Sequence, residues 1–347
     1  YVATVSSTRL WTNNCRRIGS GRWVANTNPV HLNDPNNHFS TNDYTYNVDL
    51  AYRQAALVRG ATISTIGNDA FQNTSFVVNT TLDNISNGTN PSWHADVYQA
   101  HTTGVPPADN RIIYNYKATN VHYQGIFMRA DAGMATDNAF VNVLIEMREP
   151  ADDNETGGYA FTGFAASQSW DHLIVRNCTF LVGHSEVSAT FTNSSFVGNV
   201  FYQFLHNATA VGVPIPAFAQ PGNAGNNEFL YNHFMYVYKE TGSCTPNTRF
   251  VAGGWPCPHW YAKRPDSLAA GSATTGDGVI DLTDPAAISF GAPLANSVLI
   301  DRLPFSAVPA DIYGNPRVGK SEVGAIEISS SQPLPPSIST PAGFQVK

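Results

Sequence analysis

A short pattern of apolar and polar positions recurs along the middle of the chain. Two apolar residues are followed by one spacer residue and then by Asn or Gly, after which the chain returns to apolar residues. The six copies are residues 57–60, 76–79, 112–115, 174–177, 196–199 and 229–232, and a shorter seventh copy is residues 140–142. They recur roughly every 19 to 36 residues, a period that indicates stacked coils rather than a single globular core.

The segments around these copies have the composition of short β-strands. They are rich in β-branched and aromatic residues and are bounded by Asn, Gly, Ser or Asp. Long amphipathic helical periodicity is absent from the sequence. Strands at irregular intervals fit a coil that keeps its core strands while its outer loops vary in length. The pattern therefore predicts an all-β chain folded as a parallel β-helix, in which each coil rises by about 4.8 Å.

The Asn at the end of each copy has a physical reason to be there. Asn tolerates the left-handed backbone of a bend between two strands. Stacked in register, its amide can also hydrogen-bond to the Asn above and below it. We therefore expect a structural role for Asn79, Asn115, Asn177, Asn199 and Asn232. Gly60 allows the bend but cannot join such a ladder.

Composition limits the classes of partner. Only 13% of residues are charged and the net charge is −7, without a block of Lys or Arg, so nucleic acid and anionic membranes are poor candidates as partners. No apolar run approaches the ~20 residues of a membrane helix. Cys244 and Cys257 flank a loop rich in Gly, Pro and Trp, where a disulfide would suit a secreted protein, whereas Cys178 is expected to be a buried free thiol.

The C-terminal region carries a family resemblance. Asp311, Gly314 and Arg317, followed by Gly324-Ala325 and Glu327, give a D-x-x-G-x-x-R … G-A-x-E pattern. This resembles the last rung of secreted bacterial right-handed parallel β-helix proteins of the pectate-lyase-like superfamily. The resemblance covers fewer than about 20 residues and implies an architecture, a secreted location and carbohydrate chemistry, but no particular substrate.

The resemblance also suggests how the chain is divided. Residues 1–329 would form the right-handed parallel β-helix, and residues 330–347 a Ser/Pro-rich linker leading into the first strand of a fibronectin-like module. Tyr1 does not read as a natural start, so an upstream part is expected to have been removed. The expected protein is a monomeric unit of a larger modular secreted protein.

Aligning the coils by the Asn pattern also aligns the strand that follows each of them. Asp69 and Asp96 then match in phase, as do Gln72 and Gln99. Alternate residues of a strand share a face. If small Ala95 and Val97 face inward, then His94, Asp96 and Tyr98 face outward, and neighbouring carboxylates about 5 Å apart raise one another's pKa.

This outward row is the predicted site. The expected catalytic residues are His94, Asp96, Arg129 and Asp69. The expected substrate-binding residues are Trp93, Tyr98, Gln99, Lys117, His122, Tyr123, Gln124, Asp131 and Glu186. The segment from Trp93 to Gln99 is also similar to an H-x-D-x-x-Q segment of uncharacterised secreted β-helix proteins.

Three activities remain open at this point. A polysaccharide lyase needs a base, a cation or acid that neutralises the uronate carboxylate, and an acid for the leaving oxygen. Arg129, Lys117 or His94 could serve in these roles. Asp69, Asp96 or Asp131 could hold Ca²⁺, which is the one cofactor considered. A glycoside hydrolase needs two carboxylates that flank the bond. A non-catalytic glycan-binding or adhesin-like β-helix needs neither. The lyase, acting on an acidic extracellular polysaccharide, is favoured narrowly. The alternative is that the two Asp residues cap turns, and that Arg129 and Asp131 form a surface ion pair.

Overall fold

The computed structural model describes the strand-forming part of the chain and part of its C-terminal region. Described are residues 9–19, 21, 38–86, 95–100, 109–122, 124–128, 133–147, 159–164, 169–187, 190–205, 226–239, 260–262, 273–274, 280–281, 284, 287–295, 297, 299–304 and 308–328; for residues 159–164, 182–187, 190, 202–205, 229, 234–239, 260–262 and 273–274 only the backbone is described. Within these ranges the chain forms strands and turns and no helix, which confirms the all-β prediction. A helix able to cross a membrane is accordingly not found in the described part of the chain.

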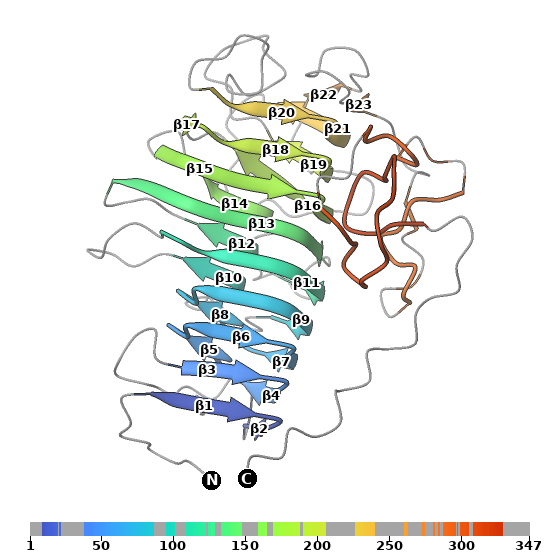
Figure 1. The fold of residues 1–347 in the computed structure, drawn as a ribbon. Helices are drawn as coiled ribbons and strands as arrows, with labels where there is room; N and C mark the ends of the chain where they lie inside the picture. The colour runs from blue at the N-terminus through green and yellow to red at the C-terminus, as the bar shows by residue number, and fades with distance from the viewer. Residues whose placement is uncertain are drawn as a thin grey trace.

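The strands lie in three stacks of parallel strands (Figure 1). The first stack contains β1 (Leu10–Asn13), β3 (His38–Thr41), β6 (Leu57–Arg59), the first part of β9 (Phe76–Ile85), of β11 (Ile112–Val121) and of β13 (Met134–Met147), then β15 (Ser169–Arg176), β18 (Ser195–Val197) and β20 (Glu228–Leu230). The second contains β2 (Arg16–Ile18), β4 (Tyr44–Val48), β7 (Thr62–Ile66), the ends of β9, β11 and β13, and the starts of β16 (Thr179–Val187), β19 (Val200–Leu205) and β21 (His233–Lys239). The third contains β5 (Tyr52–Arg53), β8 (Phe71–Gln72), β10 (Asp96–Ala100), β12 (Gln124–Met128), β14 (Tyr159–Phe164) and the ends of β16, β19 and β21.

Three short strands lie beside these stacks. The strand β17 (Thr190–Thr192) pairs in parallel with the start of β15. On β21, β22 (Trp260–Ala262) pairs antiparallel and β23 (Ala273–Thr274) pairs in parallel. The chain visits the first, second and third stacks in turn and then returns to the first, and we call one such passage a rung. Long parallel sheets joined in this order are compatible with a β-helix.

Left-handed residues form the corners between stacks. At the corner that joins the first and second stacks, the residues with positive φ occupy successive register positions: Asn14, Asn42, Gly60, Asn79, Asn115, Asn142, Asn177, Gly198 and Tyr231. The Nδ2 of Asn115 donates to Oδ1 of Asn79 at 3.0 Å, and the Nδ2 of Asn142 donates to Oδ1 of Asn115 at 2.9 Å. The predicted bend and amide ladder are therefore confirmed for this run of Asn residues.

The prediction was wrong by one position at the last two copies of the pattern. Val175 pairs with Phe196 rather than with Val197, so the corner positions fall to Gly198 and Tyr231. Asn199 and Asn232 lie one residue further on, both buried, and the Nδ2 of Asn199 donates to Oδ1 of Asn232 at 2.8 Å. They form a second short ladder. Gly198, before Asn199, takes the left-handed backbone at little steric cost, whereas before Asn232 this position is occupied by Tyr231.

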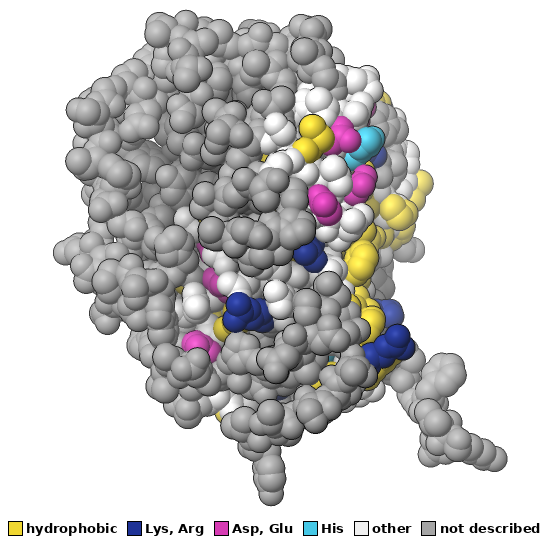
Figure 2. Space-filling model, turned by 90° about the vertical axis from the view of Figure 1, so that its left-hand side faces the viewer, with side chains coloured by type: hydrophobic (Ala, Val, Ile, Leu, Met, Phe, Trp, Pro, Cys, Tyr) yellow, Lys and Arg dark blue, Asp and Glu magenta, His cyan; other side chains and the backbone are white. Residues whose placement is uncertain are grey.

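Inward-facing and outward-facing residues alternate along the strands of the first stack. The central residues Val58, Val77, Ile113, Phe140 and Val175 are fully buried, whereas their neighbours on either side point outward. Figure 2 shows hydrophobic side chains in a column along its right-hand edge, which corresponds to the front of Figure 1. Apolar residues therefore occupy both the inner face and part of the outer face of this stack.

The inner face of the third stack is aromatic. Tyr52, Phe71 and Tyr98 occupy matching positions on β5, β8 and β10, with ring centroids 5.5 Å apart for the first pair and 6.5 Å for the second. Phe71 also meets the ring of Tyr116 edge-on at 5.7 Å. Stacked and edge-on rings add to the free energy gained by burying their area, so this aromatic column is a large part of the core.

The C-terminal segment lies alongside the stacks and does not extend them. Residues 280–328, as far as they are described, contain no strand, and the segment runs beside the second stack in Figure 1. Its apolar side chains Phe290, Leu303 and Val323 pack with Leu144 and Leu181 in a second core cluster. The expectation that the motif from Asp311 to Glu327 forms a last rung therefore differs from the observed arrangement.

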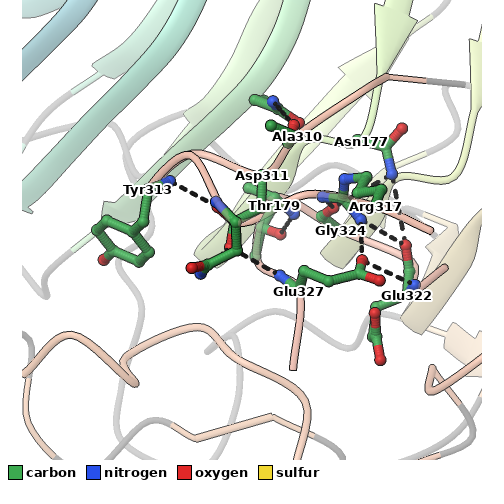
Figure 3. Close-up of polar contacts among 12 residues, drawn as sticks. Asn177, Thr179, Ala310, Asp311, Tyr313, Arg317, Glu322, Gly324 and Glu327 are labelled. Atoms are coloured by element: carbon green, nitrogen blue, oxygen red, sulfur yellow. Dashed lines mark hydrogen bonds and ion pairs between the residues drawn. The ribbon is translucent and has the colours of Figure 1, made fainter. Parts of the chain in front are cut away.

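Polar contacts hold that segment in its own fold (Figure 3). Arg317 donates from Nη1 to Glu327 Oε2 at 2.7 Å and from Nη2 to the Gly324 carbonyl at 2.8 Å. Asp311 accepts from the backbone N–H groups of Tyr313 and Asn315 at 2.8 Å each. These bonds within the segment pair polar groups that a strand would pair with its neighbours. The described residues of the motif therefore form a compact irregular segment and not a strand.

Replacing Asn115 tests the ladder. Asn115→Ala removes both amide hydrogen bonds and places a β-carbon in left-handed backbone, so we expect a loss of about 2 kcal/mol in the free energy of unfolding. Asn115→Gly keeps the backbone geometry and should lose only about 1 kcal/mol. Urea unfolding followed by circular dichroism measures both. Equal losses for the two variants would contradict the role assigned to the left-handed backbone.

Candidate functional site

Two buried carboxyl groups lie at the N-terminal ends of neighbouring strands in the third stack. Asp69 precedes β8, and Asp96 begins β10 one rung further on. The backbone N–H of Asp96 donates to Oδ1 of Asp69 at 3.2 Å, and Asp96 pairs in register with Gln124 of β12. The predicted match in phase between Asp69 and Asp96 is confirmed, and Gln72 and Gln99 also pair as expected.

The predicted face of this strand is wrong. Asp96 and Tyr98 were expected to point outward, but both are fully buried, and the Tyr98 hydroxyl donates to the Thr74 carbonyl. Ala95 and Val97 are fully buried as well, so the small apolar residues do not mark the inner face as expected. The ring of Tyr98 packs beside that of Phe71 in the aromatic column, and Asp96, two residues earlier, shares its face. The ring of Tyr98 is therefore not available to stack on a sugar.

Burial and mutual repulsion keep protons on this carboxyl pair. Burial raises the pKa of Asp69 to about 8, against which the Asp96 backbone N–H and Arg53 act in the opposite direction. Burial, followed by the charge of Asp69, raises the pKa of Asp96 as well. Both carboxyl groups are therefore largely protonated at neutral pH, and because they are adjacent their titrations are coupled.

The pair is incompletely satisfied. Oδ2 of Asp96 accepts from Nε2 of Gln99 at 3.0 Å, but its Oδ1 has no hydrogen-bond partner among the described residues. The Oε1 of Gln124, also buried, is likewise without one. Buried polar atoms are nearly always paired, and each exception needs a reason. The row of Asp69, Asp96 and Gln124 therefore combines a buried carboxyl pair with two polar atoms, on neighbouring strands, that are unpaired among the described residues.

An outward row accompanies the buried one. Arg53, Gln72, Gln99 and Phe127 occupy matching positions on β5, β8, β10 and β12. Arg53 is exposed and the other three are half-buried. Nε2 of Gln72 donates to Oε1 of Gln99 at 2.9 Å, while Gln99 also reaches the carboxyl of Asp96. Gln99 thus connects the outer face to the buried carboxyl pair, and we call these four residues the outer polar row.

Comparison with known proteins adds nothing to this geometry. No family model, curated protein or solved structure matches the chain. The described residues also contain no group of three or more His, Cys, Asp or Glu side chains placed to hold a metal ion. The site must therefore be interpreted from its own residues.

The remaining predicted residues divide into three sets. Lys117 is separate from the site: it lies on the second stack, where its Nζ donates to the Tyr313 hydroxyl at 3.0 Å and to the Ala287 carbonyl at 3.4 Å. His122 follows β11, and its backbone N–H donates to the Ile85 carbonyl at 3.0 Å. Outside the described residues are Trp93, His94, Tyr123, Arg129 and Asp131, together with the side chain of Glu186 and the expected disulfide between Cys244 and Cys257.

Sequence reasoning overlooked Arg53 and a buried ion pair near the N-terminus. Arg17 donates from Nη2 to Oδ2 of Asp43 at 2.6 Å, and Ser40 donates to the same oxygen at 2.6 Å. Burial, then the charge of Arg17, lowers the pKa of His38 to about 4. These residues precede the first copy of the repeated pattern, so the pattern could not align them with later coils. The left-handed Asn42 next to Asp43 is the signal that could have placed them in register.

The pH dependence of stability tests the carboxyl pair. Asp69 has a usual pKa of 3.8 and holds its proton to about pH 8 when folded. The folded state therefore binds more protons than the unfolded state between these values, so this contribution to stability is complete below pH ~4 and is lost as the pH rises towards ~8.

Asp96→Asn removes the repulsion and should flatten this dependence. Relative to the native chain, the variant should gain about 2 kcal/mol in the free energy of unfolding between pH 5 and pH 8. Thermal unfolding across this pH range measures the effect, and Asp137→Asn, at an exposed carboxyl group, is the control. Parallel curves for the native chain and Asp96→Asn would rule out a raised pKa of Asp96 in the folded state.

Proposed function

We propose that this chain is a secreted right-handed parallel β-helix that cleaves an acidic polysaccharide by β-elimination on the outer face of its third stack. The fold part of the proposal is supported by the order in which the chain visits the three stacks. Parallel strands ordinarily need long crossover connections. Here single left-handed residues such as Asn79 and Asn115 turn the chain from one stack into the next. Such short turns are expected when successive strands belong to one continuous coil.

The outer polar row is the observation that carries the functional part. It provides a cation at Arg53, amide groups at Gln72 and Gln99, and a flat apolar ring at Phe127. Cations and amides recognise carboxylate and hydroxyl groups, while an aromatic ring suits the C–H face of a pyranose. The segments that carry His94 and Arg129 join directly onto β10 and β12, the strands that hold Gln99 and Phe127.

Each residue has a role in the proposed reaction. Arg53 and Arg129 neutralise the uronate carboxylate, which acidifies the proton at C5. His94, neutral above its ordinary pKa, removes that proton, and the electron pair forms the C4–C5 double bond as the bond from C4 to the glycosidic oxygen breaks. The leaving oxygen takes a proton from water, and the imidazolium of His94 returns its proton to solvent. Asp96 is a positioning residue, because its Oδ2 accepts from Nε2 of Gln99 and fixes that amide, and Asp69 in turn accepts from the backbone N–H of Asp96.

Calcium is the cofactor considered for this chemistry. The described residues fit it poorly, because Asp69 and Asp96 are the only carboxyl groups in the buried row and Ca²⁺ takes six to eight oxygen ligands. Asp131, the further candidate ligand, lies outside the described residues. The proposed reaction therefore depends on arginine, and not on calcium, to neutralise the substrate.

Two observations bear on the alternatives. The carboxyl groups of Asp69 and Asp96 interact directly and are fully buried, whereas a hydrolase needs carboxylates about 5 Å or more apart on either side of the bond. This geometry disfavours a hydrolase that uses this pair. The outer polar row itself contains no acid or base, and this favours non-catalytic glycan binding as the second candidate function.

The lyase is tested by incubating the protein with polygalacturonate, alginate and hyaluronate and following the ultraviolet absorbance of unsaturated uronate. We expect absorbance to rise with at least one polymer. His94→Ala and Arg129→Gln should each lower the rate at least about 100-fold, and Arg53→Gln should raise KM several-fold. Lys320→Gln, at an exposed residue on the C-terminal segment, is the control for loss of a positive charge.

Other results point to the alternatives. New reducing ends from a neutral glycan without absorbance would contradict the lyase and support a hydrolase. Binding without turnover, unchanged in His94→Ala and Asp96→Asn, would support the non-catalytic protein.

A further inference from the structure

The outer face of the first stack carries an uninterrupted apolar row. Six successive strands, β3, β6, β9, β11, β13 and β15, present apolar side chains in register and facing outward. They are Phe39, Leu57, Phe76, Ile112, Ala139 and Ile174. Phe76 is 40% exposed and Ile174 is 37% exposed, although both belong to strands whose inner residues are fully buried. On β1, Trp11 continues the row, with its ring stacked on that of Phe39 at 4.8 Å.

A second row runs beside the first, two residues further along each strand. It extends from Thr41 on β3 to Arg176 on β15 and includes Arg59 and Tyr114. We call the two rows together the outer strip. Figure 2 shows its hydrophobic column at the right-hand edge.

The charge of the outer strip is opposite to that of the whole chain. The protein has a net charge of −7, but from β3 to β15 the two rows contain Arg59 and Arg176 and no Asp or Glu. Arg176 is engaged with Ser195 and Glu228 at 3.1 and 3.4 Å, whereas Arg59 is exposed. An anionic partner is therefore electrostatically favoured on this face and disfavoured on most of the remaining surface.

The dimensions of the outer strip favour a linear partner. Six strands spaced about 4.8 Å apart give a length of about 24 Å, and two residues along a strand give a width of about 7 Å. The product is far below the ~800 Å² per partner of a stable protein interface. A surface that is one chain wide and several rungs long fits a polymer better than a second folded protein.

We propose that the outer strip binds one chain of an acidic linear polysaccharide, which lies across the strands along the stack with its pyranose faces on the apolar row and its carboxylates towards Arg59. The ligand class rests on the proposed function, but the surface is distinct from the outer polar row. A holding surface on the first stack, separate from the cleavage site on the third stack, would keep a long substrate attached between cleavage events, because two linked contacts raise the effective concentration of the polymer.

Affinity gel electrophoresis tests the outer strip. The protein should be retarded by gels containing polygalacturonate, alginate or hyaluronate, and not by gels containing neutral hydroxyethyl cellulose. Phe76→Ser should weaken retardation about fivefold, and Arg59→Gln about threefold at low salt, with the latter difference lost at high salt. Both side chains point outward, so neither change removes core packing.

Matched controls lie off the outer strip. Val318→Ser replaces an apolar residue that is 78% exposed on the C-terminal segment, and Lys320→Gln removes an exposed charge close by. Neither should alter retardation. Binding unchanged in Phe76→Ser and Arg59→Gln, equal losses in the controls, or no retardation by any of the three acidic polymers would overturn the proposal. So would a native dimer in light scattering that Phe76→Ser converts to a monomer, because the strip would then be covered by a second copy.

The outcome separates this proposal from the proposed function. Retardation that depends on Phe76 in a protein that forms no unsaturated uronate would leave the outer strip standing and refute the lyase. Turnover by a protein whose retardation is unchanged in Phe76→Ser would support the lyase and refute the proposed role of the outer strip.

Discussion

The left-handed residue at each corner is the constraint on which the rest of the structure depends. Four corner rows repeat it along the stacks. Beside the long row from Asn14 to Tyr231 there are three others, formed by Asn47, Thr65, Asn84 and Asn120, by Gln54 and Asn73, and by Asn110, Asp137, His172, Asn193 and Asn226. A strand that enters and leaves through such fixed corners cannot slip by one residue without exchanging its inner and outer faces. The corners therefore decide which side chains reach the core and which reach a partner.

The sequence predicts this constraint where Asn itself occupies the corner. Asn79, Asn115 and Asn177 were recognised because each follows an apolar pair, and their register is as expected. The same reasoning misplaces the corner at Gly198, since a Gly followed by Asn offers two residues that accept left-handed backbone and the pattern cannot choose between them. Contact with the strands on either side makes that choice, and those contacts are not visible in one sequence.

The sequence predicted which residues of the candidate site are neighbours, but not which of them face inward and which outward. The pairing of Asp69 with Asp96 and of Gln72 with Gln99 follows from counting residues between corners. Which of them faces outward depends on Tyr98, because β10 carries Val97 and Gln99 on one face and the large ring of Tyr98 on the other. The ring enters the core beside Phe71 and carries Asp96 inward with it, so a preference of one aromatic residue reverses the face of the whole strand.

Two of the buried carboxyl groups outside the C-terminal segment, those of Asp43 and Asp96, differ in the partners of their oxygens. Both oxygens of Asp43 have partners, with Arg17, Thr12 and Ser40 on one and the N–H of Cys15 on the other, and such a network needs no ligand to complete it. Asp96 lacks a partner for one oxygen and has a neighbouring carboxyl group in place of a cation. Burying that arrangement costs stability that an apolar pair would not. A fold already held by its corners and its aromatic column has no structural need to bear this cost, and strongly shifted carboxyl groups of this kind concentrate at functional sites. The contrast supports the proposal that the third stack is the functional one, because Gln99 joins its carboxyl pair to the outer face, whereas the Arg17–Asp43 pair has the complete set of partners expected of a structural contact.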